Sequence, residues 1–299
     1  MHTDEYQIDP TLVRLLIDSQ FPRWAGLDIR PVASAGTDNA LFRLGADLVV
    51  RLPRHARAAR QVEKEQRWLP ILAPNLPFEI PVPLATGAAA ASYPFSWSVC
   101  RWIEGANPST ARCNDDGMAC DLARFILALQ KIDAREGPPP GPHNFWRGVD
   151  LAARDAITRD AIAKLEGTID VAAATAAWEA DARAPAGSSA PVWIHGDLSA
   201  GNMLERDGRL CAVIDFGGAA VGDPACDLIV AWSLFAGEAR AKFHHALAVD
   251  DACRARGRGW ALSTALVALP YYRDTNPGLV AASKRVVEEV LADFSGQSC

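Results

Sequence analysis

Residues 192–217 read VWIHGDLSAGNMLERDGRLCAVIDFG, and this stretch decides how the rest of the chain is interpreted. Three short apolar segments, 192–194, 203–205 and 210–214, predict β-strands, and Asp207-Gly208 is typical of a tight hairpin turn. Asp197 and Asn202 then bracket one compact loop, while Asp215 follows a buried strand. The spacing predicts that these three polar side chains converge.

The three residues have the chemistry that phosphoryl transfer from a nucleotide requires. A carboxylate must accept the proton of the attacking hydroxyl, and a carboxylate with an amide oxygen must hold Mg²⁺ on the phosphates. On this interpretation Asp197 is the base, and Asn202 and Asp215 are the metal ligands. Taken singly, each acidic residue is more often a cap or a solvated loop residue, but their joint order favours a kinase-type site.

The pattern His-x-Asp-x-x-x-x-Asn followed by Asp-Phe-Gly matches the catalytic loop and metal motif of kinases, with Gly196 where protein kinases carry Arg. With Gly222-Asp223-Pro224-x-x-Asp227-Leu228 added, it resembles the aminoglycoside phosphotransferase family, whose relatives include macrolide phosphotransferases and choline kinases. The resemblance implies a bilobal, protein-kinase-like α+β fold. A small antiparallel-sheet lobe is expected over 1–103 and a mainly helical lobe over 104–299, with His195 bracing the catalytic loop.

The composition is that of a globular protein of 299 residues, long enough to bury a sizeable core. The net charge is −6, with about +1 in residues 1–102 and about −7 in the rest. This balance argues against a nucleic-acid-binding surface and is compatible with a cationic small substrate. We expect a monomer or weak homodimer.

The chain has no apolar run near the 18 residues of a membrane span, and its first residues lack a secretory signal. We therefore expect a cytoplasmic protein without membrane contact. The seven cysteines are odd in number and scattered, which supports neither a disulfide framework nor a zinc site.

The first lobe is expected to begin with a helix capped by Asp9-Pro10, followed by strands over 28–33, 40–44 and 48–52. The turn between the first two strands carries Gly36, which permits close approach, and the amides of Thr37, Asp38 and Asn39. Such a turn can lie over nucleotide phosphates. An ordinary hairpin turn fits the local sequence equally well.

Arg51 ends an apolar strand, and the next helix, expected over 57–72, carries Glu63 and Glu65. In kinases a cation on the third strand grips the α- and β-phosphates and pairs with a Glu of the next helix. By resemblance Arg51 and Glu65 take these places, with Glu63 as the alternative partner. Most of the family has Lys where this chain has Arg51, although some macrolide phosphotransferases resemble it in carrying Arg.

A further strand over 97–103 ends in Glu104-Gly105-Ala-Asn-Pro108, which we interpret as the hinge between the lobes. The family resemblance implies that an adenine bonds backbone groups near Arg101 and Ile103, with Cys100 lining the pocket.

The second lobe is expected to be helical over 116–133 and to form two Ala-rich helices within 145–183. Asp223-Pro224 starts another helix, and a last helix covers 276–294. For Asp223 and Asp227 two roles stay open, namely capping of that helix or structural support of the catalytic loop. Five acidic residues are candidates for a cleft wall: Asp250, Asp251, Asp274, Glu288 and Glu289.

The predicted reaction is Mg²⁺-dependent transfer of the γ-phosphoryl group of ATP, or of GTP, to a hydroxyl of a small molecule. An aminoglycoside-type antibiotic is one candidate acceptor. The alternatives are a choline-, sugar- or homoserine-like metabolite or a macrolide. A nucleotide-binding pseudokinase and an interaction protein are the alternatives from other functional classes, although all three polar residues of the site are present.

Overall fold

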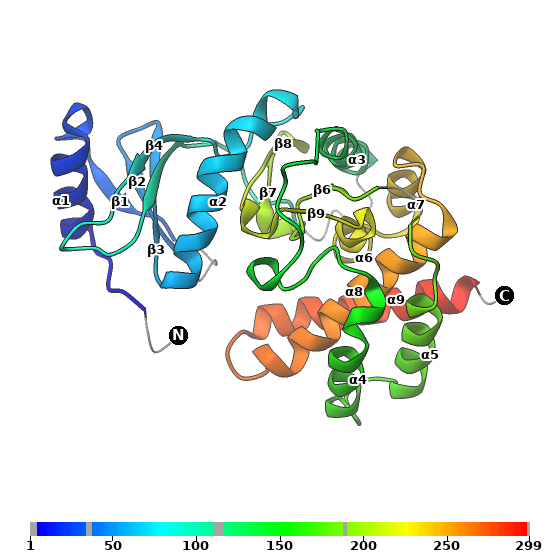
Figure 1. Ribbon diagram of the computed structural model, residues 1–299. Coiled ribbons are helices and arrows are strands. Elements are labelled where there is room, and N and C mark those ends of the chain that lie inside the picture. Colours follow the sequence, from blue (N-terminus) through cyan, green and yellow to red (C-terminus); the bar gives the residue numbers. More distant parts are fainter. Residues whose placement is uncertain (1–4, 34–37, 110–115, 188–189, 298–299) are drawn as a thin grey trace. The chain divides into compact units, whose positions relative to one another are not determined.

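The computed structural model describes residues 5–33, 38–109, 116–187 and 190–297, and its ribbon is shown in Figure 1. The chain divides into two compact units. The first comprises Met1–Ala106 and Cys211–Gly217, and the second comprises Asn107–Leu210 and Gly218–Cys299.

The α-helices are α1 (Pro10–Gln20), α2 (Ala56–Leu72), α3 (Asp116–Gln130), α4 (Asp155–Lys164), α5 (Val171–Ala182), α6 (Val230–Ser233), α7 (Gly237–Ala246), α8 (Asp251–Tyr272) and α9 (Pro277–Gln297). The strands are β1 (Ile29–Pro31), β2 (Asn39–Leu44), β3 (Leu48–Pro53), β4 (Pro83–Gly87), β5 (Trp97–Arg101), β6 (Val192–Ile194), β7 (Met203–Arg206), β8 (Arg209–Val213) and β9 (Ala220–Gly222). Short 3₁₀ helices are η1 (Pro22–Trp24), η2 (Ala73–Asn75), η4 (Pro142–Asn144), η5 (Leu151–Arg154), η6 (Ala200–Asn202), η7 (Phe216–Gly218) and η8 (Pro224–Ile229).

The first unit is built on a five-stranded antiparallel sheet with the order β1-β2-β3-β5-β4. Helices α1 and α2 flank this sheet (Figure 1). Helix α1 begins as the sequence predicts, because the Asp9 side chain accepts a hydrogen bond from the Leu12 amide and Pro10 stands at the first helical position.

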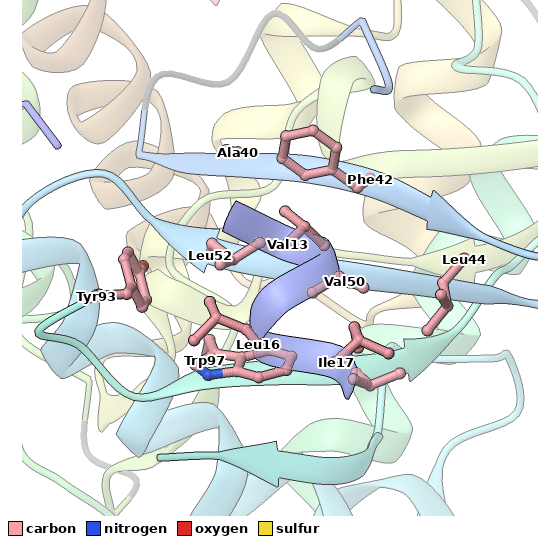
Figure 2. Close-up of a cluster of buried hydrophobic side chains, with 11 residues drawn as sticks. Val13, Leu16, Ile17, Ala40, Phe42, Leu44, Val50, Leu52, Tyr93 and Trp97 are labelled. Atoms are coloured by element: carbon pink, nitrogen blue, oxygen red, sulfur yellow. The ribbon is translucent and has the colours of Figure 1, made fainter. Parts of the chain in front are cut away.

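One face of the sheet forms the core of this unit together with α1, as Figure 2 shows. Side chains along a strand alternate between faces, so Val50 and Leu52 of β3 enter this core. Each fully buried aliphatic or aromatic side chain of this kind contributes about 1.5–3 kcal/mol of hydrophobic stabilisation. The alternation places Arg51 on the opposite face, toward α2, where Glu65 contacts it.

Segment 211–217 joins the first unit, whereas the sequence placed it within the helical lobe. The Glu79 amide donates to the Cys211 carbonyl at 3.1 Å, and the Val213 amide donates to the Glu79 carbonyl at 3.0 Å. Glu79 and Ala212 thus form an isolated parallel bridge. A single bridge of this kind leaves no hydrophobic periodicity in the sequence, so the sequence does not predict it.

The second unit holds the remaining helices around α8, which packs against α4, α5, α9 and η8. Strand β6 pairs antiparallel with β9. Strands β7 and β8 form a two-stranded sheet, and the turn between them has φ of 54° at Asp207 and 77° at Gly208. Positive φ at both turn residues is the conformation that the Asp-Gly pair predicts.

Two expected helices differ from the structure. Residues 145–150 are not helical, and the two Ala-rich helices begin only at Asp155 and Val171, separated by Gly167 at φ 75°. After the Asp223 cap, residues 224–229 form a 3₁₀ helix rather than an α-helix, with an i→i+3 bond from the Cys226 amide to the Asp223 carbonyl. No helix within the described ranges is long and apolar enough to cross a membrane.

Candidate active site

The loop that carries Asp197 follows β6 and turns at Gly196. Gly196 has φ 77°, and a Cβ built there would lie 2.5 Å from the Gly218 carbonyl oxygen. Only glycine satisfies both conditions, because an L side chain is strained at this φ and the contacted atom is backbone. The Arg that protein kinases have at this place would not fit here. The Asp197 side chain is 42% exposed and is therefore accessible to a substrate.

Asp227 holds this loop through hydrogen bonds to its backbone. Its carboxylate accepts hydrogen bonds from the His195 amide at 2.7 Å and from the Gly196 amide at 2.8 Å, and it is 1% exposed. Burial raises the pKa of Asp227, while the charges of His195 and Arg147 and the two amide bonds act in the opposite direction. Of the two roles left open for Asp227, these hydrogen bonds correspond to support of the loop.

Asp223 has a different position from Asp227. Its Oδ1 accepts from the Ala225 amide at 3.0 Å, which is the N-cap geometry, and its Oδ2 pairs with Arg256 Nε at 2.7 Å. The sequence is compatible with helix capping by Asp223 and by Asp227. The structure shows Asp223 as the N-cap residue.

His195 and Asn202 complete the loop. The Asp197 amide donates to Nδ1 of the buried His195 at 3.2 Å. Nδ2 of Asn202 donates to the Asp197 carbonyl at 2.8 Å and approaches Asp197 Oδ2 at 3.3 Å. Since the amide nitrogen of Asn202 is used within the loop, its side-chain oxygen is the atom that suits a cation.

Arg147 is a residue of this site that the sequence analysis did not identify. Its Nη1 lies 2.6 Å from Asp197 Oδ1. The buried Asn144 fixes the backbone here, because its Nδ2 donates to the Arg147 carbonyl at 2.9 Å and to the Gly218 carbonyl at 3.3 Å. The available signal for Arg147 as a site residue was the stretch Asn-Phe-Trp-Arg-Gly. Its polar and aromatic residues have no periodic pattern and lie between a Pro-rich break and a helix.

In the first unit, Arg51 and Glu65 form a buried ion pair. Arg51 Nη1 lies 3.0 Å from Glu65 Oε2, and the two side chains are 12% and 4% exposed. Burial by itself would lower the pKa of the Arg51 guanidinium, but Glu65, Cys100 and Asp215 together raise it. Glu63 is exposed, so Glu65 is the partner among the two glutamates that the sequence left open.

The turn after Asp215 is attached to α2 in this unit. Glu65 Oε1 accepts from the Phe216 amide at 3.1 Å, and Lys64 Nζ donates to the Gly217 carbonyl at 2.5 Å. Asp215 itself is exposed and has φ 62°, a left-handed conformation that is uncommon for a residue other than glycine. Two consecutive residues of α2 therefore fix the peptide groups 215–216 and 217–218, which lie close after the candidate metal ligand in the chain.

The candidate phosphate loop is only partly described. Gly36 and Thr37 lie outside the described residues. The Asp38 carbonyl accepts from the Arg54 amide at 2.8 Å, and Asn39 opens β2 opposite Pro53. Asn39 Oδ1 is buried and accepts no hydrogen bond from the described part of the chain.

The candidate adenine-contacting residues lie at the end of β5. Cys100 is fully buried, and burial raises the pKa of its thiol to about 11 against the opposing charge of Arg51. Arg101 is exposed and pairs with Leu48 in the sheet, while Ile103 is 9% exposed.

The fold is shared with solved phosphotransferases. The complex of an APH(2") enzyme with GDP and kanamycin is 20% identical, with a TM-score of 0.71 over 93% of this chain and 98% of that one. A ternary complex of APH(2")-IIa with streptomycin and ATP is 19% identical, with a TM-score of 0.62 over 96% and 97%. The macrolide 2'-phosphotransferase MphH from Brachybacterium faecium, as apoenzyme, is 22% identical, with a TM-score of 0.64 over 93% and 98%.

These likenesses confirm the kinase-like α+β fold that the sequence predicts. No curated protein sequence matches the chain. The family model described as the phosphotransferase enzyme family matches residues 28–261, which is most of the chain. The chain therefore belongs to the phosphotransferase enzyme family.

Proposed function

We propose that this protein transfers the γ-phosphoryl group of a nucleoside triphosphate to a hydroxyl of a small molecule, with Mg²⁺ as cofactor. The observation that carries the proposal is the setting of Asp197. Its half-exposed carboxylate is mounted on a loop whose two preceding amides are held by the buried Asp227. A carboxylate accessible on one side and positioned on the other suits a residue that orients and deprotonates a bound hydroxyl.

The proposed reaction needs little from Asp197 beyond position and charge. The acceptor oxygen attacks the γ-phosphorus, the bond to the β-phosphate oxygen breaks, and the hydroxyl proton passes to a carboxylate oxygen of Asp197. Support from Asp227 and His195 keeps that carboxylate in place without rearrangement during the reaction.

The residues that we propose for the metal have suitable donors. Asn202, in the second unit, uses its amide nitrogen within the loop and so presents its oxygen, and Asp215, in the first unit, has an exposed carboxylate. Oxygen donors of these two kinds suit Mg²⁺, which usually takes one or two protein ligands together with phosphates and water. When bound, Mg²⁺ would neutralise charge on the phosphates.

Arg51 with Glu65 is proposed to bind the phosphates of the nucleotide. The ion pair fixes the guanidinium direction, and the planar fork of Arg can make two parallel bonds to phosphate oxygens. Asp38, Asn39, Gly36 and Thr37 stay proposed phosphate-loop residues. Likewise Cys100, Arg101 and Ile103 stay proposed contacts of the base.

Both ATP and GTP are candidate donors, because the similar structures include one complex with ATP and one with GDP. Kanamycin and streptomycin occur in two of those complexes, and a macrolide phosphotransferase is the third neighbour. Aminoglycosides and macrolides are thus the first acceptors to assay, beside choline-, sugar- and homoserine-like metabolites. The cytoplasmic location and the monomer or weak homodimer stay predictions.

The test is an Asp197→Ala variant assayed with the wild type for nucleotide binding and for phosphoryl transfer. We expect turnover to fall by about 10²–10⁴-fold, the usual contribution of a general base, while nucleotide affinity stays nearly unchanged. A pseudokinase would bind nucleotide but show no transfer in the wild type. Equal loss of binding and turnover in the variant would contradict the role of Asp197.

A further inference from the structure

The ion pair between Arg147 and Asp197 differs from the pairs that hold the second unit together. In those pairs a buried or half-buried carboxylate joins two packed segments, as in Asp121–Arg209, Asp181–Arg258, Asp223–Arg256, Glu289–Arg240 and Asp293–Arg254. Of the acidic residues considered for a cleft wall, Asp250 caps α8 and Glu289 belongs to one of these pairs. Arg147 and Asp197 lie instead on irregular backbone, and the Asp197 carboxylate is 42% exposed. The packing of helices therefore does not account for this pair.

The backbone that carries Arg147 is fixed on both sides of this residue. The buried Asn144 donates from Nδ2 to the Arg147 carbonyl at 2.9 Å. The Asp223 amide donates to the Gly148 carbonyl at 2.7 Å. The guanidinium therefore reaches Asp197 from a backbone whose position is already set, and its side chain is only 20% exposed.

Two aromatic residues just before Arg147 have a strained backbone. Phe145 and Trp146 both have φ 56°, in the left-handed region that bulky side chains seldom adopt. Strain of this kind persists where the surrounding contacts impose it, and it is concentrated at functional sites. The Phe145 ring centre lies 5.8 Å from the Arg147 guanidinium carbon, within cation–π range. The strained turn thus places an aromatic ring beside the guanidinium.

The two oxygens of the Asp197 carboxylate have different partners. Oδ1 lies 2.6 Å from Arg147 Nη1, which is a short, charge-assisted contact. Oδ2 is approached by Asn202 Nδ2 at 3.3 Å, which is longer than an ordinary N–H···O hydrogen bond. Oδ1 is therefore the firmly held oxygen, and Oδ2 is the oxygen better suited to accept a proton.

We propose that Arg147 is a positioning residue for phosphoryl transfer, which holds Oδ1 of Asp197 so that Oδ2 receives the proton of the acceptor hydroxyl. This inference rests on the function proposed above. The acceptor oxygen bonds to the γ-phosphorus, the β-phosphate oxygen leaves, and the hydroxyl proton passes to Oδ2. Arg147 itself neither gives nor takes a proton, because a guanidinium stays protonated.

The same ion pair could instead be a latch that blocks Asp197 until the acceptor displaces Arg147. A latch must be able to leave, whereas the backbone of Arg147 is fixed and the contact leaves Oδ2 available. The two roles also predict opposite results when Arg147 is removed. Loss of a positioning residue lowers turnover, and loss of a latch raises it.

The test compares the full-length wild type with Arg147→Ala, Arg147→Lys and Asp197→Ala. Arg135→Ala is the matched control, because Arg135 is an exposed arginine of the same unit that pairs with Asp133. Phosphate release from Mg²⁺-ATP and Mg²⁺-GTP is measured in water alone and with kanamycin, a macrolide, choline or glycerol as acceptor. The fastest of these reactions gives kcat and the nucleotide KM, and titration calorimetry gives the ADP affinity. Arg147→Ala is also assayed with millimolar methylguanidinium, and with urea as the uncharged control.

We expect Arg147→Ala to lower kcat by about 10²-fold, the cost of a misplaced reactive group, while nucleotide KM and ADP affinity stay within about twofold. Methylguanidinium should restore at least part of the lost kcat and urea none of it. Arg147→Lys should lie between Arg147→Ala and the wild type, because Lys keeps the charge without the planar fork. Arg135→Ala should match the wild type.

An unchanged kcat in Arg147→Ala would overturn the positioning role, and a higher kcat would assign the latch instead. A raised nucleotide KM with kcat retained would overturn it as well, since Arg147 would then bind the nucleotide. So would a lost kcat that neither methylguanidinium nor Arg147→Lys recovers, because Arg147 would then serve only the structure of its loop. If Asp197→Ala is inactive while Arg147→Ala is fully active, only the present inference fails. If the wild type neither releases nor transfers phosphate, the proposed function itself fails.

Discussion

Each unit has a buried carboxylate that accepts a backbone N–H group next to a candidate site residue. The two carboxylates differ in the partners that balance their negative charge. In the first unit Glu65 accepts from the amide of Phe216, the residue after Asp215, and also pairs with Arg51. In the second unit Asp227 accepts from the amides of His195 and Gly196, the residues before Asp197. No Arg contacts Asp227 at ion-pair distance among the described residues.

The difference predicts how much stability the protein loses when each carboxylate is removed. Loss of Glu65 leaves a buried cation and one amide without partners, whereas loss of Asp227 leaves two amides. A buried, uncompensated charge costs more than an unsatisfied neutral group. The comparison can therefore be tested with stability measurements, from the largest expected effect to the smallest.

The largest effect is expected for Glu65→Leu. Because Arg51 would be left buried and unpaired, we expect the free energy of unfolding to fall by about 3–5 kcal/mol, measured by urea denaturation. The control Glu63→Leu changes an exposed glutamate two residues earlier in α2 and is expected to stay within about 0.5 kcal/mol of the wild type.

The double variant Arg51→Met/Glu65→Leu separates the cost of an unpaired buried charge from the other costs of losing Glu65. Replacing both charges by apolar groups removes the unpaired cation, so most of the lost stability is expected to return, while nucleotide binding does not. A double variant as unstable as Glu65→Leu would show that the Phe216 amide, not Arg51, dominates the cost. The contrast between the two units would then disappear.

The sequence predicts the first of these clusters better than the second. Arg51 follows from strand alternation, and Glu65 shares a helical face with Val62, Leu69 and Leu72, which are all buried. That spacing agrees with the assignment of Glu65, rather than the alternative Glu63, as the partner of Arg51. Regular elements carry periodic patterns, and most of their boundaries agree with the structure within one to three residues.

The contacts that the sequence does not predict involve irregular backbone. Arg147 reaches Asp197 from a loop in which Phe145 and Trp146 have positive φ, a conformation that neither residue type signals. The support of the loop by Asp227 depends on hydrogen bonds to backbone amides, which leave no mark in side-chain identity. The bridge between Glu79 and Ala212 is likewise a contact between backbones.

The second effect in size is expected for Asp227→Asn. The amide oxygen can accept one of the two N–H groups, but the amide nitrogen faces the other as a donor, so we expect a loss of about 1.5–3 kcal/mol in unfolding free energy. The turnover number should fall while nucleotide affinity is retained. Asp207→Asn, in the exposed hairpin turn, is the matched control. Unchanged turnover in a folded Asp227→Asn protein would argue against its positioning of Asp197.

A smaller effect, separable into two causes, is expected for Gly196→Ala. Gly196 and Gly167 have nearly equal φ, 77° and 75°, but a Cβ at Gly167 meets nothing within 4 Å. Gly167→Ala therefore reports the backbone strain alone, about 1 kcal/mol, and Gly196→Ala adds the clash with the Gly218 carbonyl. We expect thermal unfolding to show the larger loss at Gly196. Equal losses would mean that the loop shifts to accept the methyl group.

The last prediction concerns pH and distinguishes the cation Lys64 of the first cluster from the cation Arg147 of the second. Burial lowers the pKa of Lys64 to about 8, against the opposing charges of Glu65 and Asp215, whereas its value in an unfolded chain is 10.5. Between these two pH values the unfolded state binds more protons, so this group makes the free energy of unfolding rise with pH there, and it contributes no slope well below pH 8. The Arg147 guanidinium beside Asp197 stays charged throughout this window.

Urea denaturation of the wild type and of Lys64→Met from pH 7 to pH 10.5 tests this difference. The two plots of unfolding free energy against pH should run parallel at the acid end and diverge above pH 8, with the wild type gaining stability relative to the variant. Arg147→Met should show no such divergence. Parallel curves for Lys64→Met over the whole range would mean that Lys64 is solvated in solution and does not hold the Gly217 carbonyl.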